Sequence, residues 1–251
     1  TGPRRQVNSL AIMVHGRLSE RLHRIEDRVA ETCARSGRDP AEIRIVAVTK
    51  GHPQTAIADA LEAGLREIGE NRVGEAVEKF SSAAAMLKSH GATRHMVGHL
   101  QRNKVLEALT VFDWVQSVDS VRLAQTLSRR MEGAGATLPI LIEVNAGGEE
   151  QKHGFPLEEA VDRAAEIGEL PGLSLRGVMT MAPLTEDVSV LRGTFQRARR
   201  LYERLLALRG QAGSAPDTLS MGMSGDYTVA IEEGSTMLRL GTVLFGERAG
   251  A

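Results

Sequence analysis

The sequence predicts an α/β fold in which eight parallel strands, each followed by a helix, close into a single (β/α)8 TIM-type barrel. Short apolar runs alternate along the chain with amphipathic helical stretches, and this alternation implies a parallel sheet. Eight such units in 251 residues fit a closed barrel better than an open sheet. No linker, charge block or low-complexity tract divides the chain, so we expect one domain over residues 1–251.

The predicted strands are separated by stretches long enough for a helix. In chain order they are residues 43–49, 66–70, 94–98, 114–118, 139–145, 175–181, 218–222 and 237–245. Two of the helical stretches, 53–64 and 156–170, are amphipathic and begin at Pro53 and Pro156, a residue that suits the first turn of a helix.

The two ends of the chain depart from this repeat. Apolar residues at helical spacing predict an extra N-terminal helix over about residues 8–36, with its apolar face at Leu18, Leu22, Ile25, Val29 and Cys33. The last predicted strand is followed by GERAGA alone, so we expect the N-terminal helix to cover the gap in the outer ring. Residues 1–7 are expected to be disordered or a remnant of expression.

Composition and charge favour a small-molecule partner. A net charge of -1 and an aromatic content of 3% offer neither the field nor the stacking surface that nucleic acid needs. No apolar run near the start is long enough to span a membrane. The single cysteine, Cys33, excludes an internal disulfide and is consistent with a cytoplasmic location. The seven histidines show no metal-ligand spacing, so no metal site is predicted.

Chemistry in such a barrel belongs at the C-terminal ends of the strands, because the loops there form the open concave face. The residues predicted at those ends are Lys50, Asn71, His99, Ser117, Asp119, Asn145, Met181, 220–224, Gly241 and Thr242. Asp119 and Ser120 precede a helix and are most simply its N-terminal cap. The list at the strand ends therefore contains the functional candidates.

Lys50 directly follows the first predicted strand. An ammonium group at the mouth of an apolar barrel loses hydration, which lowers its pKa and makes the amine available to form a Schiff base with an aldehyde. The alternative is a lysine whose stem covers the rim while its charge stays in water. Position alone leaves both readings open.

Glycine and hydroxyl residues follow the seventh and eighth strands, in SMGMSGD (220–226) and RLGTVLFG (239–246). Barrels of this kind commonly bind phosphate there through backbone N–H groups. Gly241 would let the backbone approach an anion, and Thr242 would add a hydroxyl donor. Arg239 shares a strand face with Gly241, and its cation suits an anionic ligand, although a salt bridge inside the barrel is the alternative. Together with Lys50, these residues suggest a ligand with an aldehyde and a phosphate.

The chain resembles the pyridoxal 5'-phosphate (PLP) homeostasis protein family. The matching motifs are VAVTK, EIGENRVGEAVEK, HMVGHLQRNK, VQSVDS, VNAGGEEQKHG, RGVMTMAP and LSMGMSGDYTVAIEEGSTMLRLGTVLFGER, which together cover nearly the whole chain. The resemblance implies a barrel of the alanine racemase N-terminal type, without the second domain of true racemases. Two departures, Arg72 in place of an aromatic residue and Ala146-Gly147 in place of a serine, put a ring contact from the fifth strand in doubt.

The resemblance also implies roles for individual residues. Lys50 would carry PLP as an internal aldimine, and Asn71 would lie near the cofactor ring. The positions that match the family's phosphate-binding and neighbouring residues are Ser224, Gly241, Thr242 and Arg239.

The implied function is that of a PLP carrier, a cytoplasmic monomer that holds the cofactor, passes it to apoenzymes and so affects amino-acid and keto-acid balance. The alternative is a PLP-dependent amino-acid racemase, which needs two positioned acid–base groups. Neither Tyr202, in mid-helix, nor Tyr227, at a helix start, is well placed to be the second group, which favours the carrier. Without the resemblance, an aldolase acting on sugar phosphates through Lys50 also remains open.

Overall fold

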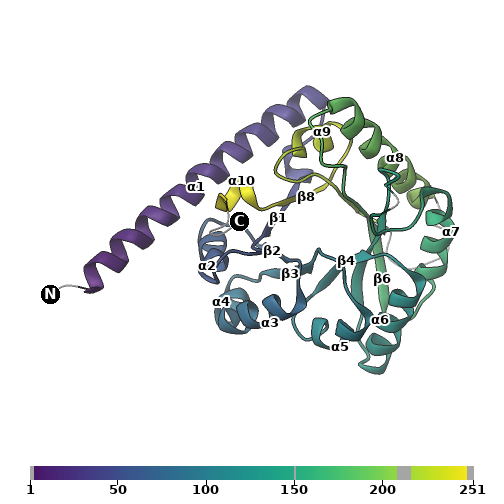
Figure 1. Ribbon diagram of the computed structural model, residues 1–251, viewed down its shortest axis with the longest axis horizontal. Coiled ribbons are helices and arrows are strands. Elements are labelled where there is room, and N and C mark those ends of the chain that lie inside the picture. Colours follow the sequence, from purple (N-terminus) through teal and green to yellow (C-terminus); the bar gives the residue numbers. More distant parts are fainter. Residues whose placement is uncertain (1–2, 150, 208–215, 248–251) are drawn as a thin grey trace.

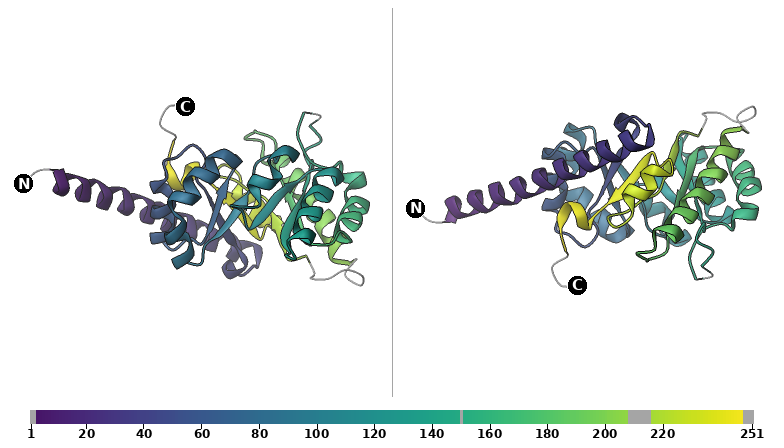
Figure 2. Two further views of the ribbon diagram at one scale, coloured as in Figure 1. Left: turned by 90° about the horizontal axis from the view of Figure 1, so that it is seen from below. Right: turned by 90° about the horizontal axis from the view of Figure 1, so that it is seen from above.

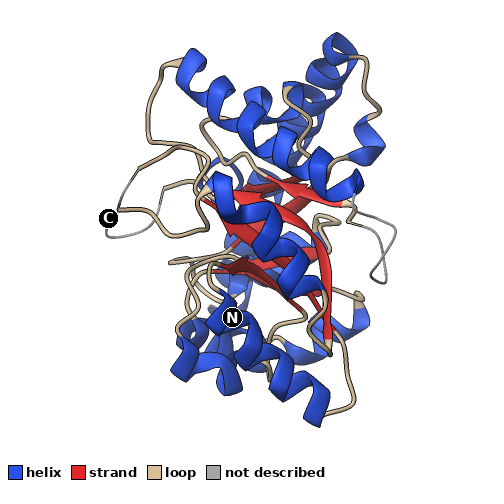
Figure 3. Cartoon of the chain, turned by 90° about the vertical axis from the view of Figure 1, so that its right-hand side faces the viewer, coloured by secondary structure: helices blue, strands red, loops and turns tan. Residues whose placement is uncertain are grey.

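A computed structural model describes residues 3–149, 151–207 and 216–247, with side chains from residue 18 onward. Eight parallel strands form a closed barrel in sequence order, with helices around it (Figures 1 and 3). The strands are β1 (Arg44–Val48), β2 (Glu67–Glu70), β3 (Thr93–Met96), β4 (Trp114–Val118), β5 (Leu138–Val144), β6 (Leu173–Thr180), β7 (Thr218–Ser220) and β8 (Met237–Leu240). The predicted (β/α)8 barrel is confirmed.

The helices lie outside the strands, around the barrel (Figure 1). They are α1 (Pro3–Ser36), α2 (Thr55–Glu62), α3 (Val73–Ser82), α4 (Ala84–Ser89), α5 (Val105–Ala108), α6 (Val121–Gly133), α7 (Leu157–Gly168), α8 (Val188–Ala207), α9 (Tyr227–Glu232) and α10 (Thr242–Phe245), with 3-10 turns at Pro40–Glu42 and Arg102–Lys104. No helix in the described ranges combines the length and apolar character needed to cross a membrane.

The N-terminal helix α1 closes the outer ring, as expected. It packs against α9, α10 and α2, and its predicted apolar face is buried from Leu18 to Cys33. The helix begins at Pro3 rather than near residue 8, so most of the segment expected to be disordered is helical. Its first turns extend past the barrel (Figure 2).

The eighth strand is shorter than predicted. It ends at Leu240, and Thr242–Phe245 form the short helix α10, whose first bonds run from the N–H groups of Leu244 and Phe245 to the Gly241 carbonyl. A short run with three apolar residues, Val243 to Phe245, fits a strand or one helical turn equally well, so the sequence pattern could not separate them. Beyond the end of β8, the N–H groups of Gly241 and Val243 donate to the Ser224 hydroxyl in the loop after β7.

Candidate functional site

A cavity of about 1070 Å³ opens at the C-terminal ends of the strands. All six residues predicted from the sequence as site residues line it: Lys50, Asn71, Ser224, Arg239, Gly241 and Thr242. They come from β8 and from the loops after β1, β2, β7 and β8. The fold therefore brings residues as far apart in sequence as Lys50 and Thr242 into the wall of one cavity.

The backbone on both sides of Lys50 is held by a buried polar network. The Nζ atom of Lys79, on α3, donates to the Thr49 carbonyl at 2.7 Å and to a carboxylate oxygen of Glu70 at 2.8 Å. It also donates at 2.6 Å to Glu75, which in turn accepts the Gly51 N–H at 2.7 Å. Residues 49 and 51 are thus both fixed, so the direction in which Lys50 leaves β1 is fixed too.

The carboxylates of this network respond differently to their surroundings. Burial raises the pKa of Glu70, against the opposing effect of hydrogen bonds from Lys79 and Thr49. Burial also acts on Glu75, but hydrogen bonds from Lys79 and the Gly51 N–H outweigh it and lower the pKa. Sequence reasoning missed this network. The spacing of Glu75 and Lys79 by four residues on a helix was a readable signal for an ion pair, but not for its burial.

The loops after β7 and β8 form a cup of hydroxyl and backbone N–H groups. Ser224 Oγ accepts hydrogen bonds from the N–H groups of Gly241 at 3.4 Å and Val243 at 3.2 Å. A Cβ atom on Gly241 would lie 3.2 Å from the Val48 carbonyl oxygen, so this backbone approaches β1 closely. Gly222 has φ of 96°, a left-handed conformation that favours glycine. Such a set of donors fits a phosphate group. The Asp226 carboxylate also lies in the cavity wall, where it accepts the Met223 N–H.

Arg239 lies inside the barrel below this cup. Its guanidinium donates to Ser220 Oγ at 2.7 Å and to the Thr180 carbonyl at 2.8 Å, and the residue is only 5% exposed. Burial lowers the pKa of Arg239 to about 10, while the charges of Asp226 and Glu143 oppose that effect. The side chain therefore remains a cation at neutral pH. Among the described residues it forms no ion pair, so the predicted alternative of a barrel salt bridge is not what holds it.

Arg239 is anchored by a chain of hydrogen bonds through the barrel interior. Ser220 Oγ, which accepts from Arg239, donates to Gln116 Oε1 at 2.7 Å. The Gln116 amide contacts His95 Nδ1 at 3.1 Å, and His95 Nε2 contacts Glu67. With the Gln116 amide as donor, Nδ1 is the acceptor and Nε2 is the nitrogen that faces Glu67. The orientation of Arg239 is therefore set by groups that reach the opposite end of the barrel.

The chain is similar in sequence to known proteins. The sequence profile of the family described as "Alanine racemase, N-terminal domain" matches residues 21–249. The pyridoxal phosphate homeostasis protein of Escherichia coli K12 is 38% identical over 232 residues, which are 92% of this chain and 97% of that protein. The chain belongs to the pyridoxal phosphate homeostasis protein family. The family membership predicted from the sequence motifs is thus confirmed.

Solved structures of similar proteins have the same barrel. PipY of Synechococcus elongatus PCC7942, solved with PLP bound, is 33% identical and has a TM-score of 0.78, with 91% of this chain and 100% of that chain covered. An unknown protein from Bifidobacterium adolescentis is 36% identical, with a TM-score of 0.89 and coverage of 93% and 96%. The chain therefore has the same fold as a protein solved with PLP bound, and it covers the full length of that protein.

Other candidates lie where their strand positions place them. Met181 and Met223 line the cavity, whereas Met179 and Met221, one pleat earlier, are fully buried in the core. Tyr227 is the first residue of α9. Neither Tyr202 nor Tyr227 is among the described residues that line the cavity. The wall of the cavity therefore offers no phenol to act beside Lys50.

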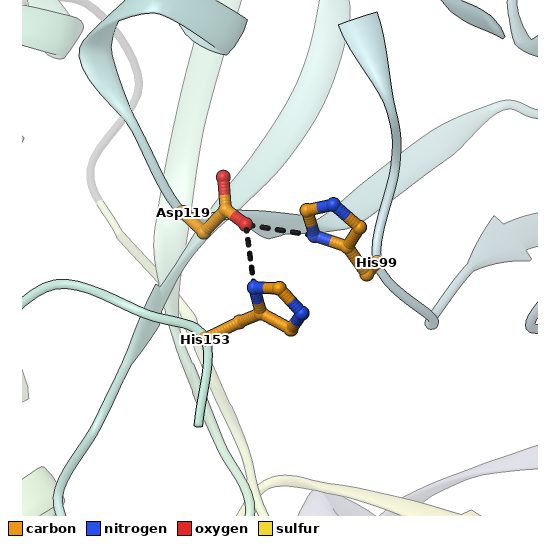
Figure 4. A group of neighbouring side chains, drawn as sticks. All are labelled: His99, Asp119 and His153. Carbon is orange, nitrogen blue, oxygen red and sulfur yellow. Dashed lines mark hydrogen bonds and ion pairs between the residues drawn. The ribbon is translucent and has the colours of Figure 1, made fainter. Parts of the chain in front are cut away.

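Two of the strand-end candidates, His99 and Asp119, form a group with His153, which the sequence analysis did not single out. Asp119 Oδ2 lies 2.9 Å from His99 Nδ1 and 3.7 Å from His153 Nδ1 (Figure 4). Only Ser120 caps α6, where its Oγ accepts the Leu123 N–H at 3.3 Å, so the cap expected of Asp119 is wrong. The sequence showed no ligand spacing because the three residues lie on three separate loops, after β3, β4 and β5.

Proposed function

We propose that this protein binds PLP and acts in intracellular PLP homeostasis, holding the cofactor reversibly and passing it to PLP-dependent apoenzymes. The observation that carries this proposal is a single cavity in which the Lys50 side chain and the phosphate-type cup after β7 and β8 are both wall residues. When bound, PLP supplies an aldehyde that condenses reversibly with a primary amine, and a phosphate that needs hydrogen-bond donors. Kinship with PipY, solved with PLP bound, supports the same ligand.

Each residue has a distinct part in the proposal. Lys50 presents the amine, held in direction by the network around Thr49 and Gly51. The phosphate is bound by Ser224, Thr242 and the backbone at Gly241, while Asn71 borders the ring from the loop after β2. Because Arg239 stays protonated, it can only donate hydrogen bonds to the cofactor. A cation beside the ring nitrogen of PLP would disfavour protonation of that nitrogen.

A carrier is favoured over an amino-acid racemase. A racemase needs an acid–base group on each face of the substrate, and an efficient electron sink in the cofactor ring. Lys50 supplies one group, but neither Tyr202 nor Tyr227 lines the described cavity. Incubation with L-alanine and assay for D-alanine tests the point, because steady turnover would support the racemase. We further propose a cytoplasmic monomer that binds neither nucleic acid nor membrane, in keeping with its net charge of -1.

Borohydride reduction followed by peptide mapping tests the PLP assignment. The cavity wall holds a second lysine, Lys152, whose Nζ donates to the Ala182 carbonyl at 3.0 Å. We expect reduction to fix PLP on Lys50, and Lys50→Ala to abolish the visible absorption of bound cofactor with the far-ultraviolet circular dichroism unchanged. Lys152→Ala is the matched control and retains the absorption. Cofactor found on Lys152, or on neither lysine, would contradict the proposed site.

A further inference from the structure

We propose that His99, Asp119 and His153 form a binding site for a late first-row divalent cation, with Zn²⁺ as the representative ion, at the rim of the barrel mouth. One ligand atom from each residue lies within 4.8 Å of the others. The two imidazole rings are stacked, with centroids 3.9 Å apart and planes 12° from parallel, and both Nδ1 atoms face the same carboxylate oxygen (Figure 4).

The distances are close to those of a coordination sphere. Zinc bonds of about 2.0–2.2 Å to nitrogen and oxygen put neighbouring tetrahedral ligand atoms about 3.3 Å apart. The separations of Asp119 Oδ2 from the two Nδ1 atoms, 2.9 Å and 3.7 Å, lie on either side of that value. Parallel rings must tilt toward each other to share one ion. The His99 and His153 side chains, 39% and 57% exposed, have room to do so, whereas Asp119 is 11% exposed and stays in place.

The backbone that carries the three ligands is fixed independently of them. Ser117 Oγ donates to the Gly98 carbonyl at 2.6 Å, which ties the end of β4 to the residue before His99. The Phe155 N–H donates to the Glu143 carbonyl at 2.8 Å, and the Asn145 N–H donates to the Phe155 carbonyl at 3.0 Å, which anchors the loop that carries His153. Rigid support of this kind is what a preorganised metal site requires.

The ligand set selects the class of ion. Two imidazoles and one carboxylate suit Zn²⁺ and its neighbours in the first transition row, whereas Mg²⁺ and Ca²⁺ prefer oxygen ligands only. Three protein ligands leave a fourth position for water or for a carboxylate of a small molecule. His99 also lines a second cavity of about 460 Å³, together with Lys50 and Asn71. The open position would thus be accessible from the same mouth, although cation binding does not depend on PLP.

Zinc titration of the full chain tests this site. The protein, without a polyhistidine tag and dialysed against a chelator, is titrated with Zn²⁺ by calorimetry. We expect one ion per chain, and at least a tenfold weaker affinity in His99→Ala, Asp119→Asn and His153→Ala. His23→Ala is the matched control, because His23 is an exposed histidine on α1, and its affinity should equal that of the unaltered chain. Zn²⁺ should also raise the Tm of the unaltered chain but not that of Asp119→Asn.

If Asp119→Asn fails to fold, the His153→Ala variant still tests the site. A histidine that is mainly in solvent can be replaced by alanine with little effect on stability. If His153→Ala binds Zn²⁺ as tightly as the unaltered chain, or if the unaltered chain takes up no stoichiometric ion, the site is overturned. In that case the three residues would be a hydrogen-bonded group that joins three loops and no more.

Discussion

The two sides of the main cavity are held in different ways. On the side of β1 and β2, a buried lysine and two carboxylates fix the backbone around Lys50. On the side of β7 and β8, the loops are held by the Ser224 hydroxyl and by close backbone packing, and the structure describes no ion pair within 220–226 or 241–245. A side chain that must point in one direction needs charged, directional support, whereas an anion site needs hydrogen-bond donors that face the anion.

The largest effect is expected from breaking the charged side. Lys79→Met leaves Glu70 buried without its ammonium partner, and removal of one member of a buried pair costs about 3–5 kcal/mol. Urea unfolding should therefore show a loss of this size in the free energy of unfolding. Lys88→Met, at an exposed position on α4, is the matched control and should change it by less than about 0.5 kcal/mol. If the two variants are equally stable, the contacts of Lys79 do not hold the backbone around Lys50 in place.

Glu143 is a buried carboxylate that, unlike Glu70, has no ion pair with a lysine among the described residues. Burial, and secondarily the charge of Asp119, raises the pKa of Glu143 on β5 from 4.5 to about 7, although Arg239 opposes the shift. The folded state then holds a proton that the unfolded state has lost, so stability falls as pH rises from 4.5 to 7. Glu143→Gln removes this dependence and should be more stable than the unaltered chain at pH 8, by a difference on the order of 3 kcal/mol.

Denaturant unfolding at pH 4 and pH 8, with chelator present, measures the Glu143 effect. The two proteins should be about equally stable at pH 4, because Glu143 is then protonated in both the folded and the unfolded chain. Glu158→Gln, at an exposed position on α7, is the control and should show the same difference at both pH values. A stability gain in Glu143→Gln that is identical at pH 4 and pH 8 would contradict a titrating carboxyl at this position.

Strand ends could be predicted from the sequence, whereas contacts between loops could not. Lys50 and Gly241 follow apolar runs, so the topology of a parallel barrel alone puts them at one mouth. The second half of the strand predicted over 237–245 was wrong, because an apolar run as short as Val243 to Phe245 has no distinguishable period. The group of His99, Asp119 and His153 joins three loops, and the reach of each loop depends on backbone bonds that no local pattern encodes.

The smallest expected effect tests the uncharged side. Gly241 has φ of −123°, which lies outside the left-handed range that favours glycine. The new methyl group of Gly241→Ala would lie 3.2 Å from the Val48 carbonyl oxygen, and such overpacking costs about 1 kcal/mol. Gly225→Ala is the matched control in the same region, since its added Cβ meets no atom within 4 Å and its φ is not in the left-handed range. We expect Gly241→Ala to lower both the free energy of unfolding and PLP affinity, and Gly225→Ala to leave the free energy of unfolding unchanged. If Gly241→Ala matches the unaltered chain in stability and in PLP titration, the cup does not depend on close approach of its backbone to β1.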